Sequence, residues 1–153
     1  MMFGIEDRVR ESNRIEGIHR KPNKKEIEAY NTFISLEEVT RYDLINFVHT
    51  IQKGAFLRSM PGVNVRVGNH YPPAGGKHVV ATLDDLIRRA NSNKGDDYQA
   101  YKIHHQYETL HPFTDGNGRS GRMLWYWMMG HEHSPLGFLH HWYYQTLRYR
   151  RME

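Results

Sequence analysis

Apolar residues recur every three or four positions along most of this chain, which is the spacing of one helix face. Before residue 110 the pattern predicts helices over about these ranges: 25–36, 39–53, 83–90 and 100–107. Thr82 precedes the third of them, with Asp85 three residues later, and this pair is a sequence signature of a helix start. The chain is therefore expected to be mainly α.

The same spacing returns in the last third of the chain. Leu124, Trp127 and Met128 share one face of a further helix. Pro135 cannot continue that helix, because proline lacks the backbone donor that a helix interior needs. A final helix is therefore predicted over about residues 136–149.

One segment departs from the helical pattern. Val63, Val65 and Val67 alternate with other residues at a period of two, which is the period of a β-strand, and Gly68-Asn69 follows as a turn. We interpret the segment as a small β-hairpin that leans on helices or on a ligand, since a lone hairpin is marginally stable. The alternative is a linker without strands.

Length and composition indicate one globular domain. With 153 residues, 39% of them hydrophobic, the chain can bury a single core over 1–153. No apolar run approaches the roughly 20 residues of a membrane span, no apolar leader stands at the start, and cysteine is absent. These features predict a cytoplasmic protein without disulfides or membrane contact.

The net charge of +4 is modest, and part of it lies near the carboxyl end in Arg148, Arg150 and Arg151. A basic tail can contact nucleic acid, but a solvated helix end is its more common meaning. Nucleic acid is not expected as a partner, because the aromatic residues that interleave with basic ones on such surfaces are missing elsewhere.

The stretch from His111 to Arg122, HPFTDGNGRSGR, carries the clearest chemistry. A histidine can accept a proton near neutral pH, and the carboxylate of Asp115 can hold Mg²⁺ through oxygen. Glycines flank Asn117 in a turn that opens a helix, and such a turn points backbone N–H groups at an anion. Arginines offer phosphate a planar fork of donors. The stretch therefore predicts a nucleoside triphosphate and metal site with a general base beside it.

Each part of this stretch also has a purely structural interpretation. Asp115 could serve only as a turn residue or a helix cap. The glycines could simply make a tight turn, and Arg119 with Arg122 could form a solvated basic face. The functional interpretation is favoured because all these residue types occur together. Phe113, by contrast, is interpreted as an apolar anchor that pins the loop to the core.

The stretch resembles the signature of the Fic family, His-x-Phe-x-Asp/Glu-Gly-Asn-Gly-Arg-x-x-Arg, with every fixed position present. The resemblance extends over about residues 41–149 and implies a Fic-type helical bundle in which the hairpin corresponds to the family's flap near the active site. Family members typically transfer AMP from ATP to a hydroxyl side chain of a target protein and release pyrophosphate. ATP as substrate and Mg²⁺ as cofactor are implied with that activity.

The resemblance also implies a role for individual residues. His111 corresponds to the base that deprotonates the incoming Ser, Thr or Tyr hydroxyl, and Asp115 corresponds to the Mg²⁺ ligand. The phosphate cradle is implied at Gly116, Asn117 and Gly118, with Asn117 also donating from its side chain. Contacts to the outer phosphates are implied at Arg119 and Arg122. Pairing of the target segment along the flap is implied at Val63, Val65 and Val67.

Several alternatives to AMP transfer stay open. The phosphate-transferring branch of the superfamily usually has lysine where Gly118 stands, so glycine favours AMP transfer here. Transfer of phosphate, UMP or another phosphate-linked group is one alternative, and removal of AMP by a water that Glu16 orients is another. Outside enzymes, the alternative is a catalytically silent nucleotide-binding module.

A second resemblance lies within residues 1–20. Ser12-Asn13-Arg14-Ile15-Glu16-Gly17 is similar to the Fic inhibitory motif, Ser/Thr-x-x-x-Glu-Gly/Asn. The resemblance implies that Glu16 pairs with Arg122 where the γ-phosphate should bind, and Ser12 is the other fixed position. The structural alternative is a surface helix end that Gly17 caps.

Two further groups of residues give weaker signals. A zinc site is not expected, because the spacing of the late histidines is not that of a strong ligand set: His131, His133, His140 and His141. Self-modification is left open at Tyr71, Tyr143 and Tyr144. The sequence carries no signature of a particular target protein or oligomeric state.

Overall fold

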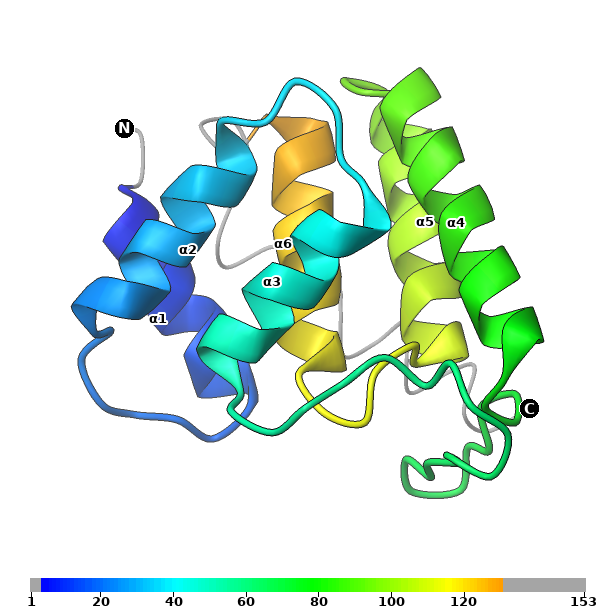
Figure 1. Cartoon of the computed structure of the whole chain (residues 1–153). Coiled ribbons are helices and arrows are strands. Elements are labelled where there is room, and N and C mark those ends of the chain that lie inside the picture. Colours follow the sequence, from blue (N-terminus) through cyan, green and yellow to red (C-terminus); the bar gives the residue numbers. More distant parts are fainter. Residues whose placement is uncertain (1–3, 131–153) are drawn as a thin grey trace.

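The computed structural model describes residues 4–130. In this part of the chain it contains six α-helices and no strand (Figure 1). They are α1 (Ile5–Ile15), α2 (Lys24–Ile34), α3 (Arg41–Ile51), α4 (Lys77–Ser92), α5 (Asp97–Leu110) and α6 (Asn117–Met129). The prediction of a mainly α fold is confirmed.

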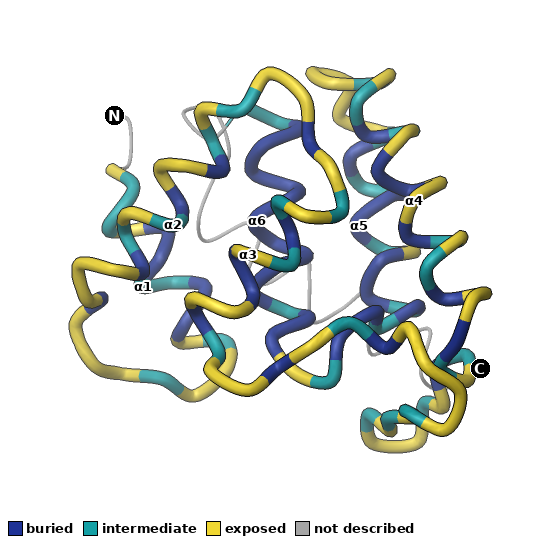
Figure 2. Tube along the Cα trace, in the orientation of Figure 1, coloured by how far each residue is buried: buried dark blue, intermediate teal, exposed yellow. Residues whose placement is uncertain are grey.

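Helix α6 is the centre of the bundle. It contacts α1, α2, α3 and α5, and Figure 1 shows it behind α3, with α1 and α2 on one side and α4 and α5 on the other. Nearly every residue of α6 is buried, as the dark trace in Figure 2 shows. The helix that carries the second half of the His111–Arg122 stretch is therefore held from several directions.

Helix α6 packs especially closely on α5 at Gly121. A Cβ atom placed there would lie 2.1 Å from Oε1 of Glu108 and 2.9 Å from Cδ1 of Tyr107. Both of these α5 side chains are buried. Any larger residue at Gly121 would thus push the two helices apart, which explains a glycine inside a helix despite its low helix propensity.

The starts of α2 and α3 follow from local sequence. Asn23 accepts a hydrogen bond from Glu26 N at 2.9 Å, and Glu26 Oε1 accepts one from Asn23 N at 3.3 Å. Thr40 and Asp43 form the same reciprocal pair at the start of α3. Each pair satisfies backbone donors that would otherwise lack a partner. The predicted helices over 25–36 and 39–53 are confirmed.

The predicted start of α4 at Thr82 is wrong, because the helix already begins at Lys77 and Thr82 lies inside it. The preceding residue, Gly76, has a φ of 137°, which favours glycine, and its N–H donates to the carbonyl of Arg58 at 3.0 Å. Val79 is fully buried, so the apolar face extends beyond the predicted range 83–90. A tertiary contact of the loop thus sets where α4 begins.

The predicted hairpin is reduced to one bridge in the described residues. Val67 N donates to His70 O at 2.9 Å and His70 N donates to Val67 O at 2.8 Å, but no ladder continues from this pair. The period of two survives as alternating exposure, because Val63, Val65 and Val67 are half-buried between exposed neighbours. Among the residues 4–130 the segment has no neighbouring strand, which a ladder needs. We call residues 62–73 the flap loop.

Some predictions fall outside the described residues. These are the helix over 136–149, the group of late histidines, Tyr143, Tyr144 and the three carboxyl-terminal arginines. None of the helices within 4–130 is both long and apolar enough to cross a membrane.

Candidate active site

His111 turns the chain between α5 and the loop that leads to α6. Its φ of 51° is in the left-handed region, and no other residue with a side chain within 4–130 has a positive φ. Its N–H still donates to Tyr107 O at 3.0 Å and closes the last turn of α5. The left-handed backbone ends the helix at the point where the imidazole is presented.

The ring of His111 has a defined tautomer. Its Nδ1 lies 2.7 Å from the carbonyl oxygen of Glu108. Since a carbonyl can only accept, Nδ1 carries the proton and Nε2 is the acceptor nitrogen of the neutral ring. A histidine in this form can take a proton from a hydroxyl group.

Asn117 fixes the loop between His111 and α6. Its Oδ1 accepts from Phe113 N, and its Nδ2 donates to Phe113 O, both at 2.8 Å. Phe113 is fully buried, as expected of an apolar anchor. The side chain of Asn117 therefore holds the loop. It has one further Nδ2 proton for the phosphate contact that the resemblance implies.

The amino-terminal end of α6 borders a cavity of about 200 Å³. Gly116, with a φ of 77°, precedes the helix and lets the chain turn into it. The first N–H groups of a helix have no partner within it and carry a partial positive charge, so they suit an anion. The cavity is lined by Glu16, Val65, Arg66, Val67, His111, Thr114, Asp115, Gly116, Asn117, Gly118 and Arg119.

Asp115 is an exposed carboxylate at the edge of this cavity. Its Oδ1 accepts from Gly116 N at 2.8 Å. No group of three or more candidate metal ligands occurs within residues 4–130. Mg²⁺ commonly binds through one or two carboxylates together with substrate phosphates and water. A single carboxylate beside an anion site therefore fits an ion that arrives with a nucleotide.

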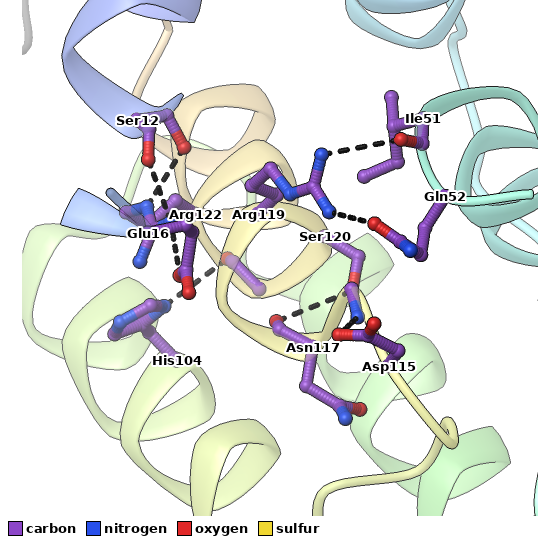
Figure 3. A network of polar contacts seen from close by, with 12 residues as sticks. Ser12, Glu16, Ile51, Gln52, His104, Asp115, Asn117, Arg119, Ser120 and Arg122 are labelled. Carbon is purple, nitrogen blue, oxygen red and sulfur yellow. Dashed lines mark hydrogen bonds and ion pairs between the residues drawn. The ribbon is translucent and has the colours of Figure 1, made fainter. Parts of the chain in front are cut away.

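Arg119 and Arg122 point in opposite directions (Figure 3). The guanidinium of Arg119 donates to Ile51 O at 3.2 Å and to Oε1 of Gln52 at 2.6 Å, at the carboxyl end of α3. The expected contact of both arginines with the outer phosphates stays a prediction; in this arrangement Arg119 bonds to residues at the end of α3 and Arg122 to residues of α1. Arg119 lines the cavity while its donors fasten α6 to α3.

Arg122 is fully buried and turns toward α1 (Figure 3). Its Nε donates to Oγ of Ser12 at 2.8 Å, and its Nη2 donates to the carbonyl of Ser12 at 3.0 Å. The same Nη2 lies 2.7 Å from Oε1 of Glu16. The expected contact between Glu16 and Arg122 is formed, and Ser12 adds two hydrogen bonds to the same guanidinium.

Glu16 reaches into the cavity from the end of α1. Gly17, with a φ of 76°, and Ile18 close that end with N–H bonds to Arg14 O and Asn13 O, the pattern of a helix terminated by glycine. The carboxylate covers the first turn of α6: a Cβ atom on Gly118 would lie 2.1 Å from Oε1 of Glu16. The end capped by glycine and the contact of Glu16 with Arg122 are thus compatible features of one segment.

Helix α1 is held in place by residues that the sequence did not single out. Asn13 Nδ2 donates to Oε2 of Glu26 on α2 at 2.8 Å, and Arg20 forms an ion pair with the same carboxylate. Burial alone would raise the pKa of Glu26, but the hydrogen bonds from Asn13 and Arg20 outweigh it and lower this pKa. Nothing in the sequence analysis pointed to these contacts, because they join residues of α1 and α2 through the tertiary structure.

His104 is a second buried histidine beside the site (Figure 3). Its Nδ1 lies 3.1 Å from the carbonyl of Gly121 on α6. Burial lowers the pKa of His104 to about 3, and the positive charge of Arg122 contributes in the same direction. His104 is therefore neutral at physiological pH. Helical spacing placed it on the buried face of α5, but nothing local indicated its proximity to Arg122.

Comparisons with known proteins identify related sequences. The model of the Fic/DOC family matches residues 38–129. The chain is 31% identical over 100 residues to a "Protein adenylyltransferase Fic" of Aedes aegypti, in an alignment that covers 61% of this chain and 19% of that protein. It is 34% identical over 86 residues to a protein of the same name in Drosophila persimilis, covering 53% of this chain and 16% of the relative. The chain thus matches only a small part of the length of these relatives.

Proposed function

Because the chain belongs to the Fic/DOC family, we propose that it is an adenylyltransferase that moves AMP from Mg·ATP to a Ser, Thr or Tyr hydroxyl of a target protein. The observation that carries the proposal is one cavity that brings His111 together with the amino-terminal end of α6. A base and an anion site are the two elements that such a transfer needs.

His111 is the base of the proposed reaction. The oxygen of the target hydroxyl attacks the α-phosphorus, its proton passes to Nε2 of His111, and the bond from the α-phosphorus to the bridging oxygen of pyrophosphate breaks. The hydrogen bond from Nδ1 to Glu108 O supports this role, because it leaves Nε2 as the accepting nitrogen. Pyrophosphate is the leaving group.

The triphosphate is proposed to bind at the start of α6. Gly116, Asn117 and Gly118 line the cavity at the start of the helix, and the first backbone N–H groups of a helix suit phosphate oxygens. Asp115 would hold Mg²⁺, which offsets the charge of the triphosphate when it is bound. Arg122 supplies the guanidinium for the outermost phosphate once its partners on α1 release it.

The described arrangement is proposed to be an inhibited one. Glu16 occupies the space above Gly118 and bonds to Nη2 of Arg122, so a γ-phosphate cannot use the same donor at the same time. A nucleotide that enters with Glu16 in place would bind in a pose unsuited to in-line attack. The function of Ser12 in this proposal is to hold Arg122 toward α1.

The flap loop is proposed to hold the target segment. Val65 and Val67 line the cavity, and among the residues 4–130 only Val67 takes part in a bridge, with His70, so Val65 is outside it. An extended target segment could pair with it and place its hydroxyl near His111. Val63 lies at the base of this loop, outside the cavity lining, where its carbonyl accepts from Arg58 at 3.2 Å.

Labelled nucleotides test the activity. The protein and its Glu16→Gly variant are incubated with Mg²⁺, proteins of a cell lysate and ATP labelled in either the α- or the γ-phosphate. We expect α-label and no γ-label on protein, with more from the variant. Transfer of γ-label would indicate phosphate transfer, and preference for α-labelled UTP would indicate UMP transfer. Release of AMP from modified protein would indicate the reverse activity.

The control is Glu16→Gly combined with His111→Ala. Removal of a general base typically costs ~10²–10⁴ in rate, while ATP affinity should stay within a few-fold because the imidazole acts on the hydroxyl. Tight ATP binding without any transfer by either protein would favour the silent nucleotide-binding module.

A further inference from the structure

Arg58 is a fully buried arginine that the proposed reaction does not use. It lies in the connection between α3 and α4, and all three of its side-chain nitrogens donate to backbone carbonyls. Nε donates to His111 O at 2.7 Å and Nη2 to Leu110 O at 2.8 Å. Nη1 donates to Pro73 O at 2.8 Å and to Val63 O at 3.2 Å.

The environment of this guanidinium is unusual for a buried charge. None of the ion pairs between described residues involves Arg58, and burial lowers its pKa. Two of its acceptors, Leu110 O and His111 O, are at the carboxyl end of α5, where the helix dipole is negative and carbonyls lack helical partners. Arg58 therefore caps α5 from another part of the chain.

The other two acceptors belong to the base of the flap loop. Val63 O and Pro73 O share Nη1, which fixes the distance between the two ends of the loop. Gly75 N donates to Oδ1 of Asn64 at 2.9 Å, and a Cβ on Gly75 would lie 2.3 Å from Val63 O. The loop is thus closed tightly at its base, with Arg58 inside the closure.

Backbone contacts add to this junction. Arg58 N donates to Pro112 O at 2.8 Å, and Arg58 O accepts from Gly76 N at 3.0 Å. Arg58 thereby bonds to the carbonyl of His111, which has the left-handed backbone, and to the carbonyls of both its neighbours, Leu110 and Pro112. It also bonds to the loop that lines the cavity opposite the α6 end.

We propose that Arg58 is a positioning residue that holds the left-handed backbone of His111 and joins it to the flap loop. Its fork fixes the carbonyls of Leu110 and His111, so the imidazole stays within reach of Glu108 O and keeps its Nδ1–H form. The same fork fixes the flap loop relative to that ring. The proposal rests on the proposed role of His111 as base.

The ring nitrogens of His111 provide a test that does not require activity. In ¹⁵N-labelled protein their NMR shifts should indicate a protonated Nδ1 and an unprotonated Nε2. In Arg58→Gln the backbone at 111 can relax, and the ring should shift toward the Nε2–H form that free histidine prefers. This measurement tests the positioning role of Arg58 even if the chain transfers no AMP.

Kinetics in the Glu16→Gly background give the second readout. We expect Arg58→Gln to lower kcat by about 10–100-fold, since a small misplacement of a catalytic group has an effect of this size. KM for ATP should not change, because Arg58 contacts no residue of the α6 end. If Arg58→Gln raised KM for ATP as much as it lowered kcat and left the ring shifts unchanged, Arg58 would contribute only to general stability. That result would overturn the proposal.

Two variants separate geometry from charge and from stability. Arg58→Lys keeps the charge but not the fork, so it should still show altered ring shifts and a lowered kcat; behaviour like the parent would overturn the proposal. Arg8→Gln removes another fully buried arginine, whose guanidinium lies 5.6 Å from the ring centre of Tyr126. The Arg8→Gln variant should have a lower free energy of unfolding but unchanged ¹⁵N shifts of the His111 ring.

If the Arg58 variants do not fold, measurements on the parent protein test the proposal instead. The Nε–H of Arg58 should then exchange slowly with water and show an NOE to the backbone of His111. Fast exchange without that NOE would overturn the proposal.

Discussion

The carboxylate of Glu16 lies 2.7 Å from Nη2 of Arg122, which joins the end of α1 to the middle of α6. The arginine side chain is fully buried, whereas the glutamate side chain is 38% exposed. Solvent screens such a pair, so its contribution to folding stability is small. The larger consequence of the pair is that Glu16 occupies Nη2 of Arg122 and the space above Gly118, both of which a phosphate would need.

Replacing Glu16 with glycine should raise AMP transfer. If the closed arrangement is favoured by about 2–3 kcal/mol, only about one molecule in a hundred is competent, and relief can approach two orders of magnitude. The rate of α-label transfer measures the gain. Glu6→Ala removes a glutamate of the same helix that pairs with Arg10 and not with Arg122, so it is the matched control and should have no effect. Equal rates for the parent and Glu16→Gly would contradict the inhibitory role.

Ser12→Ala should raise activity less than Glu16→Gly does. The change removes the Oγ acceptor of Arg122 Nε but leaves the Ser12 carbonyl in place. A hydrogen bond to a charged group contributes about 1.5–3 kcal/mol, so the free energy of unfolding should fall by a similar amount. Both residues act on one guanidinium, so the effects of Ser12→Ala and Glu16→Gly on activity should be non-additive in a double-mutant cycle. Additive effects would mean that Ser12 acts elsewhere.

Val65→Pro should reduce labelling of target proteins while ATP binding stays unchanged. Proline removes one backbone donor from the flap loop and leaves the bridge between Val67 and His70 in place. Val65→Thr keeps the donor and a similar shape, so it should transfer AMP like the parent. Calorimetric ATP binding and target labelling are measured on the same samples. Parallel loss of both would assign the segment a structural role only.

Asp115→Asn should raise the Mg²⁺ concentration needed for half-maximal transfer. The amide keeps an oxygen for the Gly116 N–H, so the loop is retained while the charge that attracts the ion is lost. A Mg²⁺ titration in the Glu16→Gly background measures the shift. Unchanged Mg²⁺ dependence, or full transfer in excess chelator, would remove Asp115 from the metal site.

The protein should lose stability between pH 6.5 and pH 4. The pKa of His104 is about 3 in the folded state and about 6.5 when unfolded, so in this range the unfolded chain binds a proton that the folded chain does not. The free energy of unfolding should fall by up to about 1.4 kcal/mol per pH unit from this group as the pH decreases. Above pH 6.5 the contribution to the slope disappears.

Denaturant unfolding at several pH values checks this expectation. His104→Gln should flatten the slope, whereas His78→Gln, at an exposed position on α4, should keep it. A slope that persists between pH 6.5 and pH 4 in His104→Gln would assign the acid sensitivity to other groups. Because the pKa of Glu26 is lowered in the folded state, the contribution of this carboxylate to the free energy of unfolding falls only at more acidic pH than that of His104.

Much of the fold was accessible from sequence because helices depend on local patterns. The period of apolar residues acts within a few residues, and the helices that it predicted over 25–36 and 39–53 are present as α2 and α3. The candidate site residues were accessible for the same reason, since a short stretch holds a histidine, a carboxylate and a glycine-rich helix start. The start of α4 was not, because a backbone contact with Arg58 sets it.

The sequence by itself determined which side chains are available for the chemistry, and the tertiary structure decided what each one touches. Arg119 and Arg122 are equivalent in the pattern, yet one bonds to α3 and the other to α1. The flap loop alternates like a strand but finds no neighbouring strand within 4–130. Arg58 gave no local signal, since two of its side-chain acceptors, Leu110 O and His111 O, are more than 50 residues away in the sequence. Partners of long side chains and of unpaired backbone depend on which elements pack together, and only the folded chain brings those elements into contact.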